Sequence, residues 1–83
     1  MEVRVFGPGC ARCKQLFEMV RDVMAAEGIA GDVEYVQDIA EFAAYGVMIT
    51  PALVINGEVK VAGRIPKRRE LADWLQDAGI ISG

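Results

Sequence analysis

Two cysteines separated by two residues carry the most distinctive chemistry in this chain. They lie in residues 7–14 (GPGCARCK), where a Pro/Gly turn ends a short apolar run and a helical pattern begins. At this spacing the first sulfur would lie at a helix N-terminus and the second one turn further along, within bridging distance. A disulfide that closes so short a loop adds little stability. Because the chain has no other cysteine and no histidine, we interpret the pair first as redox chemistry and second as a structural link.

Thiol–disulfide exchange requires a thiolate, an exposed attacking sulfur and a second thiol that resolves the mixed disulfide. Cys10, on a glycine-rich turn, is the predicted nucleophile, and Cys13, on the apolar side of the helix, is the predicted resolving cysteine. A free cysteine is only a few per cent thiolate at neutral pH. The helix N-terminus, together with the cations Arg12 and Lys14, is expected to lower the pKa of Cys10 and so to favour its thiolate.

Length and charge narrow the classes of protein to consider. With 83 residues, 53% of them hydrophobic, the chain has room for one domain, residues 1–83, and no second core. We find no apolar run near the roughly 20 residues of a membrane span and no secretory signal. We therefore expect a cytoplasmic monomer whose thiols rest mostly reduced. A net charge of −3 and a pI near 4.8 argue against nucleic-acid or anionic-membrane binding.

The first half of the chain alternates β-type and helical patterns. Residues 2–6 and 33–36 are short, β-branched and aromatic, which predicts strands. Apolar residues at helical spacing predict a helix over 10–27 between these two strands. A further short helix is expected to begin after Asp38, which is typical of an N-cap, and to end by Gly46.

The second half contains a hairpin and a last helix. Pro51 opens the β-type run 52–55, and Asn56-Gly57 separates that run from 58–61. Asn-Gly between two β-type runs is the strongest short-range hairpin signal. A helix is then predicted over 66–78, with an apolar stripe formed by Leu71, Trp74, Leu75 and Ala78.

The order of these elements predicts an α/β fold, β-α-β-α-β-β-α. A crossover helix allows the first two strands to pair in parallel, and the hairpin adds an antiparallel pair. The expected result is a mixed four-stranded sheet with helices on both faces. The cysteine pair then lies at the carboxyl end of the first strand, where sites collect in open α/β sheets.

At this point the chain resembles a small thioredoxin-fold protein over nearly its whole length. The resemblance rests on Cys10-Ala11-Arg12-Cys13 after the first strand, the Thr50-Pro51 step, the hairpin, Gly63 and the last helix. It is most similar to minimal thioredoxin/glutaredoxin-like redox-active disulfide proteins, and implies their minimal thioredoxin fold. The resemblance also implies a cis Thr50–Pro51 bond, with the proline packed beside Cys10 and facing the disulfide.

The sequence departs from that family at several positions. The tryptophan that thioredoxins place before the first cysteine is Gly9 here, and their Gly-Pro between the cysteines is Ala11-Arg12. The buried acid of thioredoxins falls at Arg4, so the usual proton acceptor is missing. The acidic pair with which glutaredoxins contact glutathione is replaced by residues 64–66 (RIP).

Four cations, Arg64, Lys67, Arg68 and Arg69, form a basic cluster on an acidic protein. Two interpretations stay open: a solvated loop and helix start, or a docking site for an acidic partner or an anionic cosubstrate. Positive charge at a helix start opposes the helix dipole. Glu70 occupies the position of a capping-box acid, but a lysine at the matching N-cap position cannot accept backbone hydrogen bonds, so a weakly capped helix is expected.

Taken together, these patterns predict a thiol–disulfide oxidoreductase that cycles Cys10–Cys13 between dithiol and disulfide against a protein disulfide or a dedicated reductase. We expect neither a cofactor nor a metal. One alternative is a soft-metal carrier, because two thiolates suit Cu(I). Ferredoxin-like metallochaperones also present such a pair after a first strand, although their βαββαβ fold ends in a strand. A second alternative is a non-catalytic adaptor with a vestigial motif.

Overall fold

The computed structural model describes the backbone of residues 2–9, 11–29 and 31–82, and the side chains as far as residue 78. The elements in chain order are β1 (Val3–Phe6), α1 (Ala11–Ala26), β2 (Val33–Val36), α2 (Ile39–Ala44), β3 (Ala52–Ile55), β4 (Glu58–Ala62) and α3 (Arg68–Ser82). The predicted β-α-β-α-β-β-α order is confirmed.

The four strands form one mixed sheet in the order β2-β1-β3-β4. β1 pairs in parallel with β2, as expected for strands joined by a crossover helix. β3 pairs antiparallel with both β1 and β4. The carboxyl end of β1 is therefore next to the amino end of β3, where Phe6 is opposite Ala52, and Ala52 is in turn opposite Ala62 at the end of β4.

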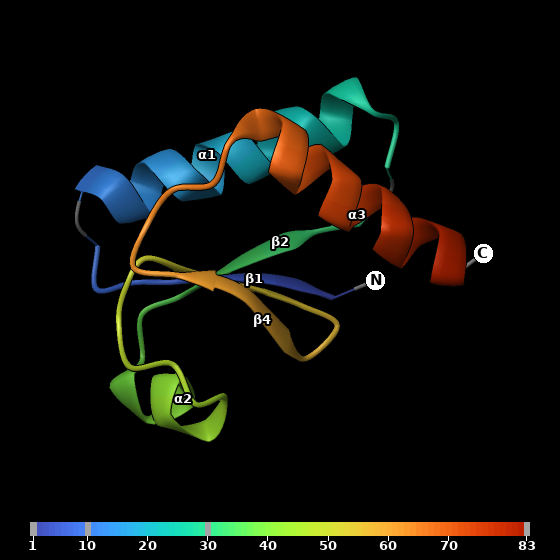
Figure 1. The fold of residues 1–83 in the computed structure, drawn as a ribbon. Coiled ribbons are helices and arrows are strands. Elements are labelled where there is room, and N and C mark those ends of the chain that lie inside the picture. The colour runs from blue at the N-terminus through green and yellow to red at the C-terminus, as the bar shows by residue number, and fades with distance from the viewer. Residues whose placement is uncertain (1, 10, 30, 83) are drawn as a thin grey trace.

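Helices cover both faces of this sheet, as predicted (Figure 1). α1 and α3 lie together on one face, and α2 lies on the other. The larger core fills the space under α1 and α3, where its buried residues include Val5, Leu16 and Leu71. A smaller core under α2 centres on Phe6, whose ring centroid lies 5.6 Å from that of Phe42. Side chains of β1 therefore alternate between the two faces of the sheet and contribute to two separate cores, Val5 to the larger and Phe6 to the smaller.

Local sequence explains the β3–β4 hairpin turn and the end of α1. Asn56 and Gly57 have φ angles of 51° and 81°, the pair of left-handed conformations that a two-residue hairpin turn requires. At the end of α1, Gly28 donates to the carbonyl of Ala25 at 3.3 Å and Ile29 to that of Met24 at 2.9 Å. This pattern of hydrogen bonds is a Schellman motif, which ends the helix at the predicted glycine.

The last helix differs from the prediction at both ends. It begins at Arg68 rather than at residue 66, and Pro66 is fully buried ahead of the first helical turn. The start is also better capped than expected, since the Glu70 carboxylate accepts the backbone N–H of Lys67 at 3.1 Å. The helix continues beyond Ala78 to Ser82. In the part of the chain that the structure describes, no helix is both long and apolar enough to cross a membrane.

Candidate functional site

Three segments that are distant in sequence converge at one edge of the sheet. α1 begins shortly after β1 ends, the α2–β3 loop leads into β3 there, and β4 leads into the β4–α3 loop (Figure 1). Backbone hydrogen bonds join these segments. The N–H of Gly63 donates to the carbonyl of Pro51 at 2.8 Å, which links the second and third segments. The first segment is tied to the end of β2, where the N–H of Gly7 donates to the carbonyl of Val36 at 3.0 Å, and to β3 through the pairing of Phe6 with Ala52.

Cys13 lies in the first turn of α1 and is fully buried, with 0% of its surface exposed. It is in the disulfide form. Gly7 lies close to it: a Cβ added to that glycine would lie 2.3 Å from the Cys13 sulfur. Cys10, the predicted nucleophile, lies outside the described residues.

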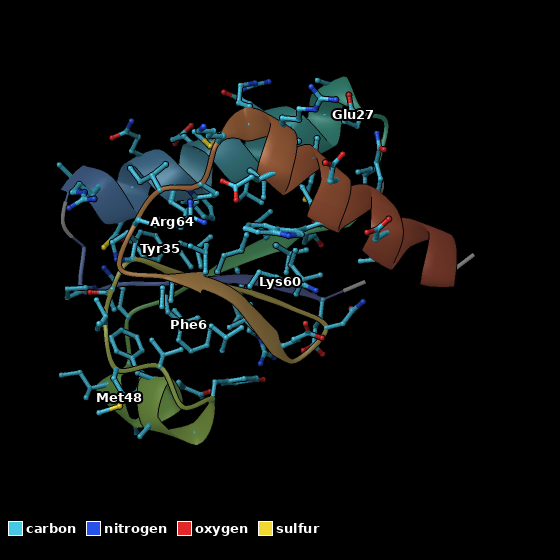
Figure 2. All side chains as sticks on the ribbon, in the orientation of Figure 1. Phe6, Glu27, Tyr35, Met48, Lys60 and Arg64 are labelled. Atoms are coloured by element: carbon cyan, nitrogen blue, oxygen red, sulfur yellow. The ribbon has the colours of Figure 1, made fainter. Side chains whose placement is uncertain are left out.

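The Thr50–Pro51 peptide bond is cis. Pro51 is fully buried and Thr50 is partly exposed. The two residues before it are exposed: Met48 at 94% and Ile49 at 61%. The predicted contact between Pro51 and Cys10 involves a residue outside the described part of the chain. Figure 2 shows Met48 at the same edge, beside α2.

Arg12 and Lys14 are exposed in the first turn of α1, and the described part of that turn contains no acidic residue. Their charges add to the positive end of the helix dipole. Both sources of positive potential therefore act where the helix begins, and both would favour an anion such as a thiolate there.

Arg4 does not lie near the cysteine. Its guanidinium donates a hydrogen bond to the hydroxyl of Tyr45, and its Cζ lies 5.4 Å from the centroid of that ring. It also lies 3.6 Å from a carboxylate oxygen of Glu2 and 3.9 Å from one of Glu34. Because Tyr45 caps α2, Arg4 belongs to the face of the sheet opposite α1.

The basic cluster is divided between one paired cation and three exposed ones. Arg64 donates to both oxygens of Glu70, at 3.1 and 3.2 Å. The hydrogen bond from Arg64 and the backbone N–H of Lys67 lower the pKa of the Glu70 carboxyl, and the same pair raises the pKa of Arg64. Lys67, Arg68 and Arg69 are exposed at the start of α3.

Two residues of this site were missed by the sequence interpretation. Gly7 was read only as a turn residue, although a glycine that follows a strand can also mark a close approach of the backbone to another group. Tyr35 of β2 was read only as a strand residue. Its hydroxyl lies 3.7 Å from the position that a Gly7 Cβ would occupy. No local signal identifies this tyrosine, because the parallel register of β1 and β2 brings it to the site.

A donor set for a metal would need several ligating side chains in one place. Among the residues that the structure describes, no three histidine, cysteine or carboxylate side chains gather in this way.

A family model described as a thioredoxin domain matches residues 1–76 of the chain. A thioredoxin of Methanothermobacter thermautotrophicus is 28% identical over 75 residues, which cover 90% of this chain and 97% of that protein. A thioredoxin of Methanocaldococcus jannaschii is 31% identical over 74 residues, or 89% and 85% of the two chains. A probable thioredoxin of Methanothermobacter thermautotrophicus is 33% identical over 81 residues, or 93% and 94%. The similarity thus extends over almost the full length of each pair.

Proposed function

Because this chain belongs to the thioredoxin family, we propose that it is a thiol–disulfide oxidoreductase whose working pair is Cys10–Cys13. The observation that supports this function best is the state and position of Cys13. It is disulfide-bonded and fully buried in the first turn of α1. The same edge of the sheet presents the cis Thr50–Pro51 segment.

The proposed reaction consists of two exchanges. The Cys10 thiolate attacks one sulfur of a target disulfide, so a mixed disulfide forms and the second target sulfur leaves as a thiolate and takes up a proton. Cys13 then loses its proton and attacks the Cys10 sulfur. The Cys10–Cys13 bond forms, the mixed disulfide breaks, and the first target sulfur leaves as a thiol. The target gains two electrons and two protons, and a dithiol reductant restores the pair.

The burial of Cys13 supports the division of roles. A sulfur with no exposed surface cannot attack a disulfide in a separate protein, but it can attack a mixed disulfide one helical turn away. The first attack is therefore assigned to Cys10. Positive charge from the helix end, Arg12 and Lys14 favours the thiolate that this attack requires.

We propose a protein disulfide as the substrate and a cytoplasmic dithiol reductase as the electron donor. A partner would meet Met48 and Ile49, which are exposed next to the cis segment. It would also meet a basic surface, defined here as the exposed cations of the α1 and α3 starts: Arg12, Lys14, Lys67, Arg68 and Arg69. Because the protein as a whole is acidic, this local excess of cations favours partners with acidic groups near their sulfurs.

The soft-metal carrier is the less favoured alternative. The carriers with a similar cysteine pair have the element order βαββαβ, whereas this chain has β-α-β-α-β-β-α, with a second helix before the β3–β4 hairpin. Stoichiometric Cu(I) binding by a protein that cannot reduce any disulfide would favour the carrier.

Trapping of the mixed disulfide tests the proposed function. Cys13→Ser, incubated with a labelled peptide disulfide, is expected to accumulate a covalent adduct that dithiothreitol removes, because the resolving thiol is absent. Cys10→Ser serves as the matched control and is expected to form no adduct. If both variants, or neither, form the adduct while the wild-type protein fails to reduce the peptide, the proposal is wrong and the non-catalytic adaptor is favoured.

A further inference from the structure

The hydroxyl of Tyr35 is buried and has no hydrogen-bond partner among the residues that the structure describes. The ring is held firmly, since it stacks on Phe17 of α1 with centroids 5.4 Å apart and planes 24° apart. Burying a hydroxyl without a partner costs free energy, and native structures leave few polar groups in that state. We therefore look for a hydrogen-bond partner that this hydroxyl could have in another state of the protein, since Cys13 is in the disulfide form here.

The Cys13 sulfur lies near that hydroxyl. One point in space, the Cβ position of Gly7, lies 3.7 Å from the Tyr35 oxygen and 2.3 Å from the Cys13 sulfur. The two atoms are thus no farther apart than the sum of these distances, and the absence of a side chain on Gly7 lets the Cys13 side chain occupy this place. Figure 2 shows Tyr35 between α1 and the sheet, toward the start of α1.

No carboxylate of the described residues is buried near the Cys13 sulfur. Among the described residues no charged side chain is buried, and Arg4 belongs to the opposite face. Thioredoxins have a buried acid where this chain has Arg4. In this chain the neighbouring strand β2 supplies the hydroxyl of Tyr35, a residue in register with Val5.

We propose that the Tyr35 hydroxyl donates a hydrogen bond to the Cys13 sulfur when the Cys10–Cys13 disulfide is reduced, and so stabilises the dithiol form. This inference rests on the proposed function. A disulfide sulfur is a weak acceptor, whereas a thiolate is a strong one, so the bond forms only in the reduced state. This explains why the Tyr35 hydroxyl has no partner among the described residues of the disulfide form.

The redox step balances without a proton from the tyrosine. A dithiol reductant passes two electrons and two protons to the disulfide, which becomes the Cys10 and Cys13 thiols, while the reductant becomes a disulfide. The Cys13 thiol is in equilibrium with its thiolate, which has released its proton to solvent, and that thiolate accepts the hydrogen bond from Tyr35. Tyr35 keeps its proton throughout and only orients its O–H toward the Cys13 sulfur. Because it stabilises the product of reduction alone, the hydroxyl shifts the equilibrium toward the dithiol.

The variant Tyr35→Phe removes the hydroxyl and leaves the ring stacked on Phe17. We expect its equilibrium with dithiothreitol to shift toward the protein disulfide by about two- to tenfold, the range of one net hydrogen bond. A tenfold shift corresponds to a reduction potential about 30 mV more negative. The thermal stability of the disulfide form is expected to stay unchanged or rise, because the hydroxyl has no partner there.

Tyr45→Phe is the matched control. Its hydroxyl accepts a hydrogen bond from Arg4 on the other face of the sheet. This variant is expected to lose stability and to keep the wild-type redox equilibrium. The inference is overturned if Tyr35→Phe leaves the equilibrium unchanged, shifts it toward the dithiol, or destabilises the disulfide form, and equally if Tyr45→Phe gives the same shift.

The two proposals fail in different ways. Should wild-type protein never reduce a peptide disulfide while Tyr35→Phe still shifts the equilibrium, the proposed function is wrong and the role of Tyr35 stands. Should the protein reduce the peptide while Tyr35→Phe and wild type share one equilibrium constant, the function stands and the role of Tyr35 is wrong.

Discussion

Gly7 and Cys13 pack so closely that the cysteine side chain fills the place where any other residue at position 7 would put its own. A Cβ on Gly7 would lie 2.3 Å from the sulfur and 2.6 Å from the Cβ of Cys13, far inside van der Waals contact. The end of β1 and the first turn of α1 are therefore fitted to each other through this one glycine.

Gly7→Ala is expected to lower the free energy of unfolding by about 1–3 kcal/mol, the usual cost of overpacking a buried site. Because Cys13 must move, the equilibrium of its disulfide with dithiothreitol is expected to change as well. Urea denaturation measures the first effect and thiol quantification the second. Gly28→Ala is the control: Gly28 has a φ of 68° and open space around it, so it loses stability by strain alone and keeps the redox equilibrium. An unchanged Gly7→Ala protein would contradict the contact.

Gly63→Ala is expected to lower the stability of the fold and, in addition, to slow the reaction with a target disulfide. The new Cβ would lie 2.8 Å from Cγ2 of Ile49. Since Ile49 is 61% exposed, its side chain can rotate into solvent, away from its place before the cis bond. The unfolding free energy should then fall by about 1–2 kcal/mol, from the φ of 86° alone. The rate of mixed-disulfide formation is expected to fall in addition.

Gly46→Ala is matched for backbone strain, because Gly46 has a φ of 72° and no atom within 4 Å of an added Cβ. It should lose similar stability and keep the wild-type rate. In an Ile49→Ala background, Gly63→Ala should not slow the reaction further. A rate loss that persists in that background would show that Ile49 does not carry the effect.

The sequence was sufficient for the order of the elements because the signals involved are local. The apolar stripe of α1 follows one helical period, and Asn56-Gly57 has no common use other than a tight hairpin turn. The position of Cys13 just beyond the carboxyl end of β1 also followed, because the β-type run 2–6 directly precedes the turn that opens the helix. The pairing of β1 with β3 was not part of the prediction. Family membership added the expectation for Thr50–Pro51, where sequence physics alone gives a weak preference.

The sequence was not sufficient where distant segments decide the outcome. Tyr35 is an ordinary strand residue until the parallel register sets its ring against Phe17 and its hydroxyl near Gly7. The start of α3 depends on how Glu70 divides its oxygens between a backbone N–H and the guanidinium of Arg64. The arrangement of Tyr35 has no signature within a short window of sequence, and that of Glu70 has only its capping-box spacing from Lys67.

Glu70→Gln is expected to destabilise the protein at neutral pH and to have no effect in strong acid. The folded structure lowers the pKa of this carboxyl from its ordinary value of 4.5. A lowered pKa means that the carboxylate stabilises the fold above the ordinary value, and that this contribution is lost as pH falls through the folded value. The glutamine can still accept the N–H of Lys67, so the difference reports the charge.

Denaturant titrations of wild type and Glu70→Gln across pH check this expectation. The two stability curves should converge below the ordinary carboxyl pKa. Asp73→Asn removes another exposed carboxylate of α3 and should give a smaller difference at neutral pH. Curves for Glu70→Gln and wild type that stay parallel throughout would mean that the ion pair with Arg64 contributes nothing.

Lys67→Gln combined with Arg68→Gln is expected to slow the reaction with an acidic peptide disulfide about two- to fivefold at low salt, because these exposed cations of the basic surface steer the partner. The cap of α3 is preserved, since it uses the backbone N–H of Lys67. At about 1 M salt the Debye length is about 3 Å, so the difference from wild type should disappear. Second-order rate constants from stopped-flow fluorescence give both quantities.

Lys60→Gln is the control for loss of charge elsewhere, because Lys60 lies along β4 and pairs with Glu58 at 3.0 Å (Figure 2). It should leave the rate with the acidic peptide unchanged. A basic peptide disulfide of the same length should react faster with the Lys67→Gln/Arg68→Gln variant than with wild type, because a repulsion has been removed. If both peptides lose rate equally and salt has no influence, the cations act on the fold of the α3 start and not on the choice of partner.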